Sequence, residues 1–151
     1  MILLDTTVLV YAVGAEHPLA DPCRQIVTGI ADGDLEATTT PEVIQELAHV
    51  RARRRGRNDA VEIASAFAVL LRPLVTVGSA DLERGLELFR GHEALGAFDS
   101  VLAAVARDRG MTLVSADAAF AKVPDRVVAS PATIASGLGG ARPPGGSAPG
   151  A

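Results

Sequence analysis

Short strand-like runs alternate with helical segments along most of this chain, and that alternation is the feature that most restricts its fold. The strand-like runs cover residues 1–4, 35–39, 74–77, 111–115 and 126–129. Segments with helical features lie at residues 6–12, 19–31, 41–55, 59–71, 79–92, 97–109 and 131–136. Strands that alternate with helices predict an α/β fold, here a three-layer α/β/α sandwich with a central, mostly parallel sheet.

The length and the C-terminal composition predict the domain organisation. The chain has 151 residues, which is the size of one ordinary domain. Residues 137–151 consist almost entirely of Gly, Pro, Ala and Ser, and such a segment buries too little apolar surface to order itself. We therefore expect one domain over residues 1–136, followed by a flexible tail over residues 137–151.

Composition excludes several classes of protein. The one cysteine, Cys23, cannot form an internal disulfide, which fits a reducing cytosol, and we expect it to be buried rather than reactive. The N-terminus has no basic signal-peptide region, and no apolar run approaches the roughly 20 residues that span a bilayer. A net charge of −4 disfavours a protein that binds nucleic acid over its whole surface. We expect a cytoplasmic protein.

Two acidic residues directly follow predicted strands. Asp5 ends the first apolar run, and Asp117 follows the run at residues 111–115. Ligands of open α/β sheets gather outside the carboxyl ends of the strands, so both acids are candidates for a functional site. Either acid alone is explained as well by a helix N-cap or a turn. Their occurrence at the same edge of one sheet favours a functional site.

Two further acids lie on predicted helices that border this edge. Glu46 lies beside the apolar face of the helix at residues 41–55, whereas Glu42 is in its first turn, where the helix dipole favours an acid whatever its function. Asp99 lies in the first turn of the helix at residues 97–109, near small apolar residues. Glu46 and Asp99 are therefore added to the candidate site, and Glu42 is interpreted as structural.

A cluster of carboxylates predicts a bound cation, because the negative charges repel one another unless a cation neutralises them. Ligand sets made only of oxygen select hard cations such as Mg²⁺ or Mn²⁺. Such a cation activates water and stabilises a leaving oxygen, so hydrolysis of a phosphodiester is the expected reaction. His17, His49 and His92 are scattered and form no competing ligand pattern.

Four ordered motifs, each built around one of these acids, resemble those of PIN-domain nucleases: Ile-Leu-Leu-Asp5-Thr-Thr, Val-Ile-Gln-Glu46-Leu, Gly-Ala-Phe-Asp99-Ser and Val-Ser-Ala-Asp117-Ala. Their order and spacing agree with the family over roughly residues 1–136. The resemblance implies a PIN-like fold, an Mg²⁺- or Mn²⁺-dependent ribonuclease, and catalytic and metal-binding roles for all four acids.

The compact length resembles VapC-type toxins of bacterial toxin–antitoxin pairs. This resemblance implies cleavage of structured RNA such as tRNA or rRNA, inhibition by a small VapB-like antitoxin, and a homodimer. It also implies that Thr6 and Ser115 are polar supports of the metal site. One position departs from the pattern: many relatives have Asn where this chain has Thr7, which leaves the role of Thr7 open.

A run of arginines follows the helix that carries Glu46; it comprises Arg51, Arg53, Arg54, Arg55 and Arg57. These cations complement the dipole at a helix C-terminus, which needs no further function. They equally suit contacts with RNA phosphates or with an acidic partner segment. The sequence leaves both interpretations open.

Three alternative functions remain to be weighed. A metal-dependent phosphatase of the haloacid-dehalogenase type needs a second Asp at the position of Thr7 and an essential lysine, for which Lys122 is the one candidate. A receiver-like signalling domain needs an acidic pair and a phospho-accepting Asp that the sequence lacks. A PIN-fold binding module for RNA or protein without activity is distinguished from the enzyme by metal-dependent turnover of RNA.

Overall fold

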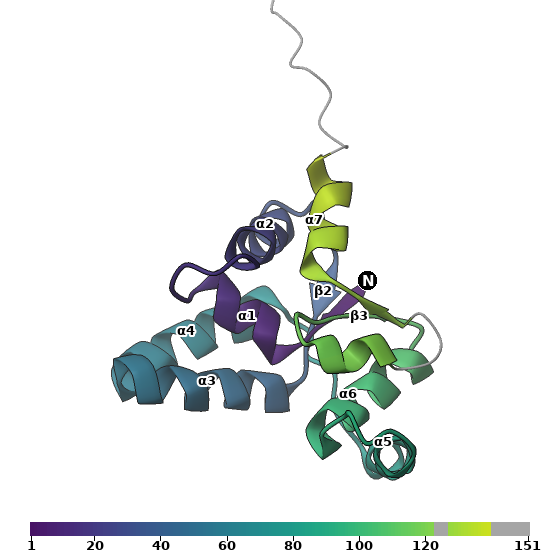
Figure 1. Ribbon diagram of the computed structural model, residues 1–151. Coiled ribbons are helices and arrows are strands. Elements are labelled where there is room, and N and C mark those ends of the chain that lie inside the picture. Colours follow the sequence, from purple (N-terminus) through teal and green to yellow (C-terminus); the bar gives the residue numbers. More distant parts are fainter. Residues whose placement is uncertain (123–126, 140–151) are drawn as a thin grey trace, which may run out of the picture.

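The computed structural model describes residues 1–122 and 127–139 of the chain (Figure 1). Four strands form one sheet: β1 (Ile2–Leu4), β2 (Ala37–Thr38), β3 (Thr112–Val114) and β4 (Val128–Ala129). The strand order is β2-β1-β3-β4, and every neighbouring pair is parallel. The predicted α/β fold with a central parallel sheet is confirmed.

Seven α-helices of the described residues flank the sheet: α1 (Thr6–Ala12), α2 (Ala20–Ala31), α3 (Pro41–Arg55), α4 (Arg57–Leu70), α5 (Ser79–Gly91), α6 (Ala97–Asp108) and α7 (Pro131–Gly139). A short 3₁₀ helix, η1 (Ala118–Lys122), follows β3. Figure 1 shows α3 packed along α4 on one flank, α5 along α6 on another, and α2 beside α7 above them. None of the described helices has the length and apolar character to cross a membrane.

The sheet and the helix starts follow from local sequence. All three residues of β1 are buried, as expected for a strand covered on both faces. Asp5, directly after β1, is the N-cap of α1 and accepts a hydrogen bond from the Thr7 backbone N–H. Thr40 caps α3 by accepting from the Val43 N–H, and Pro41 occupies the first helical position. Buried Cys23 packs in the core, and burial raises the pKa of its thiol to about 11.

The strand expected at residues 74–77 is wrong. Its backbone groups are taken by partners other than a strand: the Val75 N–H donates to the Thr39 carbonyl at 2.9 Å. The Pro73 carbonyl accepts from the Thr38 hydroxyl at 2.7 Å, and the Thr76 carbonyl accepts from Arg109. Because side chains satisfy these carbonyls, the segment needs no place in the sheet.

Several helix boundaries differ from those expected. Helix α4 begins at Arg57, two residues early, directly after Gly56, whose φ of 91° favours glycine. Helix α7 continues to Gly139, so the boundary expected at residue 137 lies inside it. Leu138 of α7 packs against Gly29 of α2, where an added Cβ would lie 3.0 Å from its side chain. Residues 140–151, and Arg126 of the last predicted strand, lie outside the described residues.

Helix α6, which carries Asp99, is fixed against α5 in two ways. A Cβ on Gly85 of α5 would lie 2.6 Å from the Cα of Val101, so the two backbones approach as closely as only glycine permits. At the other end, Arg109 donates to both carboxylate oxygens of Asp81 at 2.8 and 3.0 Å, and this pair holds the pKa of Asp81 down at about 2. The two contacts fix the position of α6 relative to α5.

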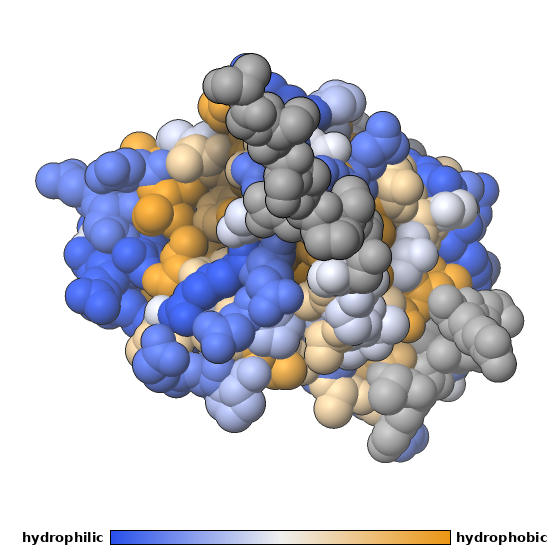
Figure 2. Space-filling model, turned by 90° about the horizontal axis from the view of Figure 1, so that it is seen from above, coloured by the Kyte–Doolittle hydropathy of each residue, from blue (hydrophilic) through white to orange (hydrophobic). Residues whose placement is uncertain are grey.

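Hydrophilic and hydrophobic residues are interspersed over the face seen from above (Figure 2).

Candidate functional site

Asp5 stands at the centre of a hydrogen-bond network at the carboxyl edge of the sheet. Its side chain is buried, and its Oδ2 accepts from the hydroxyls of Thr7 at 2.6 Å and Ser115 at 2.7 Å. Within the described part of the chain, no hydrogen bond reaches Oδ1 of Asp5. The network thus fixes one carboxylate oxygen and leaves the other available.

The two hydroxyls are themselves oriented by the backbone after β3. Thr7 Oγ1 accepts from the Ala116 N–H at 3.0 Å, and Ser115 Oγ accepts from the Asp117 N–H at 3.0 Å. An oxygen that accepts one N–H in this way points its own proton elsewhere, here toward Asp5. Asp5 is therefore positioned by Thr7, two residues away, and by residues 115–117, more than 100 positions away in the sequence.

Glu46 approaches the same edge from α3. The residue is exposed, and its Oε2 accepts a hydrogen bond of 2.6 Å from the Thr6 hydroxyl at the start of α1. This bond crosses from α1 to α3 and joins Glu46 to the residue next to Asp5. Thr6 and Ser115, the two polar residues expected to support the site, therefore contact different acids. Thr6 contacts Glu46, and Ser115 contacts Asp5.

Asp99 is the acid of the cluster whose pKa is shifted by its surroundings. Its pKa is raised from 3.8 to about 6, chiefly because burial removes water from the charged form. The negative charges of Asp5, Asp117 and Glu46 raise it further, in that order. The Gly96 backbone N–H at the start of α6 acts in the opposite direction and favours the charged form.

Asp117 is exposed just beyond β3. Its Oδ1 accepts from the Ala119 N–H at 2.8 Å, so it also caps the turn that begins η1. An open cavity of about 430 Å³ lies beside it and is lined in part by Ser115 and Ser130. The structure thus brings all four predicted acids to one edge of the sheet, where each of the other three acts on the charge of Asp99.

The donor set fits a hard divalent cation by its chemistry. It consists of carboxylate oxygens from four elements, and their mutual repulsion is the kind of strain that a cation relieves. Among residues 1–122 and 127–139, no three His, Cys, Asp or Glu side chains already stand in an arrangement that closes around one ion. The hydroxyl partners of Asp5 and Glu46 draw one oxygen of each toward the protein.

Thr7 is the residue that sequence reasoning left without a role. It contacts Asp5, Ser115 and the backbone after β3, and so joins the first and third strands at the site. The signal was present in the sequence: a hydroxyl two residues after an N-capping Asp lies within reach of that carboxylate.

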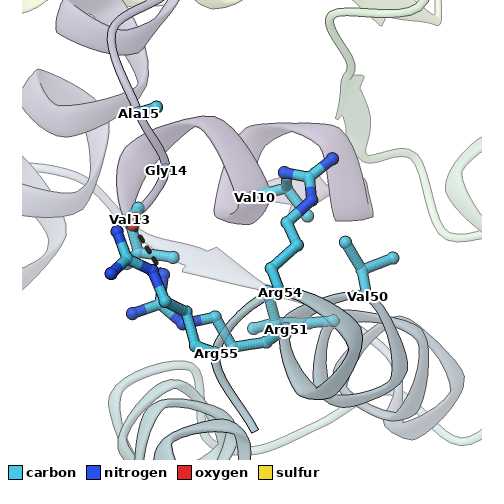
Figure 3. A pocket seen from close by; sticks show the side chains of 9 residues that line it. Val10, Val13, Gly14, Ala15, Val50, Arg51, Arg54 and Arg55 are labelled. Atoms are coloured by element: carbon cyan, nitrogen blue, oxygen red, sulfur yellow. Dashed lines mark hydrogen bonds between the residues drawn. The ribbon is translucent and has the colours of Figure 1, made fainter.

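The arginine run is divided by the fold. Arg51 forms an ion pair with Asp59 and donates to the Val13 carbonyl at 2.8 Å, which ties α3 to α4 and α1 (Figure 3). This contact lowers the pKa of Asp59 through its hydrogen bond to Arg51. The side chains of Arg54 and Arg55 line a groove between α1 and α3, and Arg53 and Arg57 do not.

An apolar surface lies on α5, near the start of α3. Leu82, Leu86 and Phe89 are each nearly half exposed, and the first two line a pocket of about 280 Å³ with Phe98 of α6. Glu42 also lines this pocket, and its Oε2 is buried with no hydrogen-bond partner among the described residues. A buried acceptor without a donor is destabilising, so the structural role assigned to Glu42 from the sequence is incomplete.

Comparison with known proteins identifies relatives over most of the chain. The family model described as PIN domain matches residues 2–126. Ribonuclease VapC7 of Mycobacterium tuberculosis is 56% identical over 129 residues, which cover 84% of this chain and 89% of that protein. Two solved structures share the fold at TM-scores of 0.63 and 0.67: a toxin–antitoxin complex from Klebsiella pneumoniae and VapBC2 from Rickettsia felis bound to a promoter DNA fragment. They are 16% and 21% identical, and cover 87% and 86% of this chain and 98% of their own chains.

Proposed function

Because the chain belongs to the PIN-domain family, among the VapC ribonuclease toxins of toxin–antitoxin systems, we propose that it hydrolyses RNA phosphodiester bonds with Mg²⁺ or Mn²⁺. The proposed catalytic and metal-binding residues are Asp5, Glu46, Asp99 and Asp117. The observation that supports this assignment is the hydrogen bonding that orients the carboxylates of Asp5 and Glu46 at the edge of the sheet. The charges of Asp5, Asp117 and Glu46 also raise the pKa of Asp99, as expected if the four acids lie close together.

The chain's own residues have distinct tasks in this reaction. Asp5, Asp99 and Asp117 would hold the cation together with Glu46, and the cation would activate the attacking water and neutralise charge on the phosphate. The hydroxyls of Thr7 and Ser115 fix Asp5 so that its Oδ1 faces away from the network. Thr6 orients Glu46 through a hydrogen bond of 2.6 Å. Such preorganisation lowers the cost of assembling the site during reaction.

The proposed substrate is structured RNA, either tRNA or rRNA, and the proposed inhibitor is a small VapB-like antitoxin. Both rest on membership of the VapC family. An inactive PIN-fold binding module is the alternative, and the complete set of four acids argues against it, since binding alone does not require clustered carboxylates.

The proposal is tested by incubating the purified chain with total bacterial RNA in Mg²⁺, in Mn²⁺ or in EDTA. We expect discrete fragments with either cation and intact RNA with EDTA. Electrophoresis followed by sequencing of the fragment ends measures the result and identifies the target. RNA that is bound but never cut, with or without cation, would instead support the binding module.

We further propose that two copies of the chain associate through the apolar face of α5. Leu82, Leu86 and Phe89 recur at helical spacing on one side of the helix, and such a stripe can face its own symmetry-related copy.

Replacing Leu86 by arginine should convert a dimer into a monomer, because removing a charge from water at an apolar contact costs more free energy than the contact supplies. Sedimentation velocity measures the change. The matched control is Val69→Arg on α4, which introduces the same charge at a residue that is 60% exposed and should leave the dimer intact. A wild-type chain that sediments as a monomer at all concentrations contradicts this proposal.

A further inference from the structure

A cationic groove lies between α1 and α3, away from the acid cluster. Its apolar surface comes from Val10 of α1, from Val13 just after α1 and from Val50 of α3, and the side chains of Arg54 and Arg55 extend along it (Figure 3). The pocket at its centre measures about 110 Å³. This is well below the roughly 300–1,000 Å³ of pockets that enclose a whole ligand, so the groove suits surface contact with a chain that passes over it.

The charges of Arg54 and Arg55 in this groove have no direct ion-pair partner, although Arg55 and Asp59 attract each other at longer range. Arg54 and Arg55 form no ion pair with any acid in the described ranges. The nearby acid, Asp59, is already bound by both Nε and Nη2 of Arg51. Guanidinium groups gathered beside apolar side chains repel one another, and a bound anion relieves that repulsion.

One helix, α3, carries both a wall of the groove and a member of the acid cluster. Glu46, Val50 and Arg54 are spaced four residues apart, so they lie along one side of α3. The distance from Glu46 to Arg54 along the helix axis is about 12 Å, since each residue rises 1.5 Å. An anion that follows this side of α3 therefore passes from the acid edge to the two arginines.

We propose that Arg54 and Arg55 bind phosphates of the RNA a few nucleotides from the bond that is cut, and so position the substrate. This inference rests on the proposed function. The planar guanidinium matches phosphate oxygens in pairs, and the aliphatic side chains between the arginines and α1 can contact ribose carbons. Arg51 has no part in this contact, because its guanidinium is occupied by Asp59 and Val13.

An acidic protein segment is the competing occupant. Its carboxylates would also pair with the arginines, and an aliphatic side chain would fit the small pocket. The alignment with Glu46 favours RNA, because a substrate that reaches the acid edge must extend along one of the helices that border it, whereas a peptide has no such requirement.

The test measures how RNA binding depends on salt. All proteins carry Asp5→Asn, so that the RNA is not cut, and the probe is a fluorescein-labelled single-stranded RNA of about 12 nucleotides, within the usual site sizes. The test variant is Arg54→Gln/Arg55→Gln. The matched control is Arg53→Gln/Arg57→Gln, which removes the same charge from the same run at residues that do not line the groove.

We expect the slope of log K against log [KCl] between about 50 and 200 mM to become less negative by about 1.4 in the test variant, because each phosphate contact on a single strand contributes about 0.7. The control should keep the wild-type slope. Equal changes in both variants, or no change in either, overturn the inference. Loss of binding to a labelled Leu-Glu repeat peptide with an unchanged RNA slope overturns it in favour of an acidic protein partner.

A second measurement separates this inference from the proposed function. In chains that retain Asp5, the Arg54→Gln/Arg55→Gln variant should raise KM for RNA and leave kcat unchanged, because the contact is the same in the ground state and the transition state. A wild-type chain that does not cut RNA refutes the proposed function whatever the salt slopes are. A chain that cuts RNA, with an unchanged KM in the variant, refutes only the arginine contact.

Discussion

Replacing Asp5 by asparagine is expected to lower kcat for RNA cleavage by at least about 100-fold, the loss typical of a group that stabilises charge in the transition state. Asparagine has almost the same shape, so the contacts of Oδ2 with Thr7 and Ser115 remain possible. The change removes the negative charge that the proposed cation needs. The rate loss therefore reports chemistry rather than loss of fold.

The control for this experiment is Asp34→Asn, at an exposed carboxylate after α2. It removes the same charge from the surface and should cleave at the wild-type rate. A further variant, Thr7→Val, should retain part of the activity, because it loosens Asp5 without removing its charge. If Asp5→Asn and the wild type give the same fragments at the same rate, the acid cluster is not the catalyst.

Replacing Asp99 by asparagine is expected to stabilise the protein in EDTA, although it should also abolish cleavage. The folded state raises the pKa of Asp99 from 3.8 to about 6, so between these pH values the folded chain holds more protons than the unfolded chain. Its stability therefore falls as the pH rises through this window, and the loss is complete above pH 6. Asparagine does not ionise and escapes this loss. A shift of this size corresponds to about 3 kcal/mol, and solvent screening of the half-buried carboxyl lowers the expected gain to about 2 kcal/mol.

Urea unfolding in EDTA at about pH 4 and pH 7.5, on either side of this window, measures the effect. The difference between Asp99→Asn and the wild type should be small at the lower pH and largest at the higher one. Addition of Mg²⁺ at the higher pH should stabilise the wild type more than the variant, because the variant has lost a ligand and a repulsive charge. A variant that is less stable than the wild type in EDTA at pH 7.5 contradicts the electrostatic account.

The fold could be predicted from the sequence because its strands and helices have different periodicities. The run at residues 1–4 and the caps at Thr40 and Gly56 depend on neighbouring residues alone. The segment at residues 74–77 has the same apolar composition but is not a strand, because Thr38 and Arg109 satisfy its carbonyls. Those partners are distant in the sequence, and no local pattern identifies them.

The same division applies to the candidate site. The positions of Asp5 and Asp117 after strands could be found in the sequence, and the parallel sheet places both at one edge. The hydrogen bonds that orient Asp5 could not, since they depend on how β1 and β3 align in space. In the sequence the arginine run is one block of positive charge. In the structure Arg51 joins neighbouring helices, whereas Arg54 and Arg55 line a groove.

The hydroxyl bridge between the two ends of the chain has a consequence during protein synthesis. Thr7 and Ser115 meet over Asp5 although 108 positions separate them, and Asp99 and Asp117 also lie in the second half of the chain. A ribosome that has translated half of the message has therefore made only Asp5 and Glu46 of the four acids. The unfinished chain carries only two of the four carboxylates, and it lacks β3, the strand that pairs with β1. The ribosome must therefore complete the chain before the protein can act on RNA.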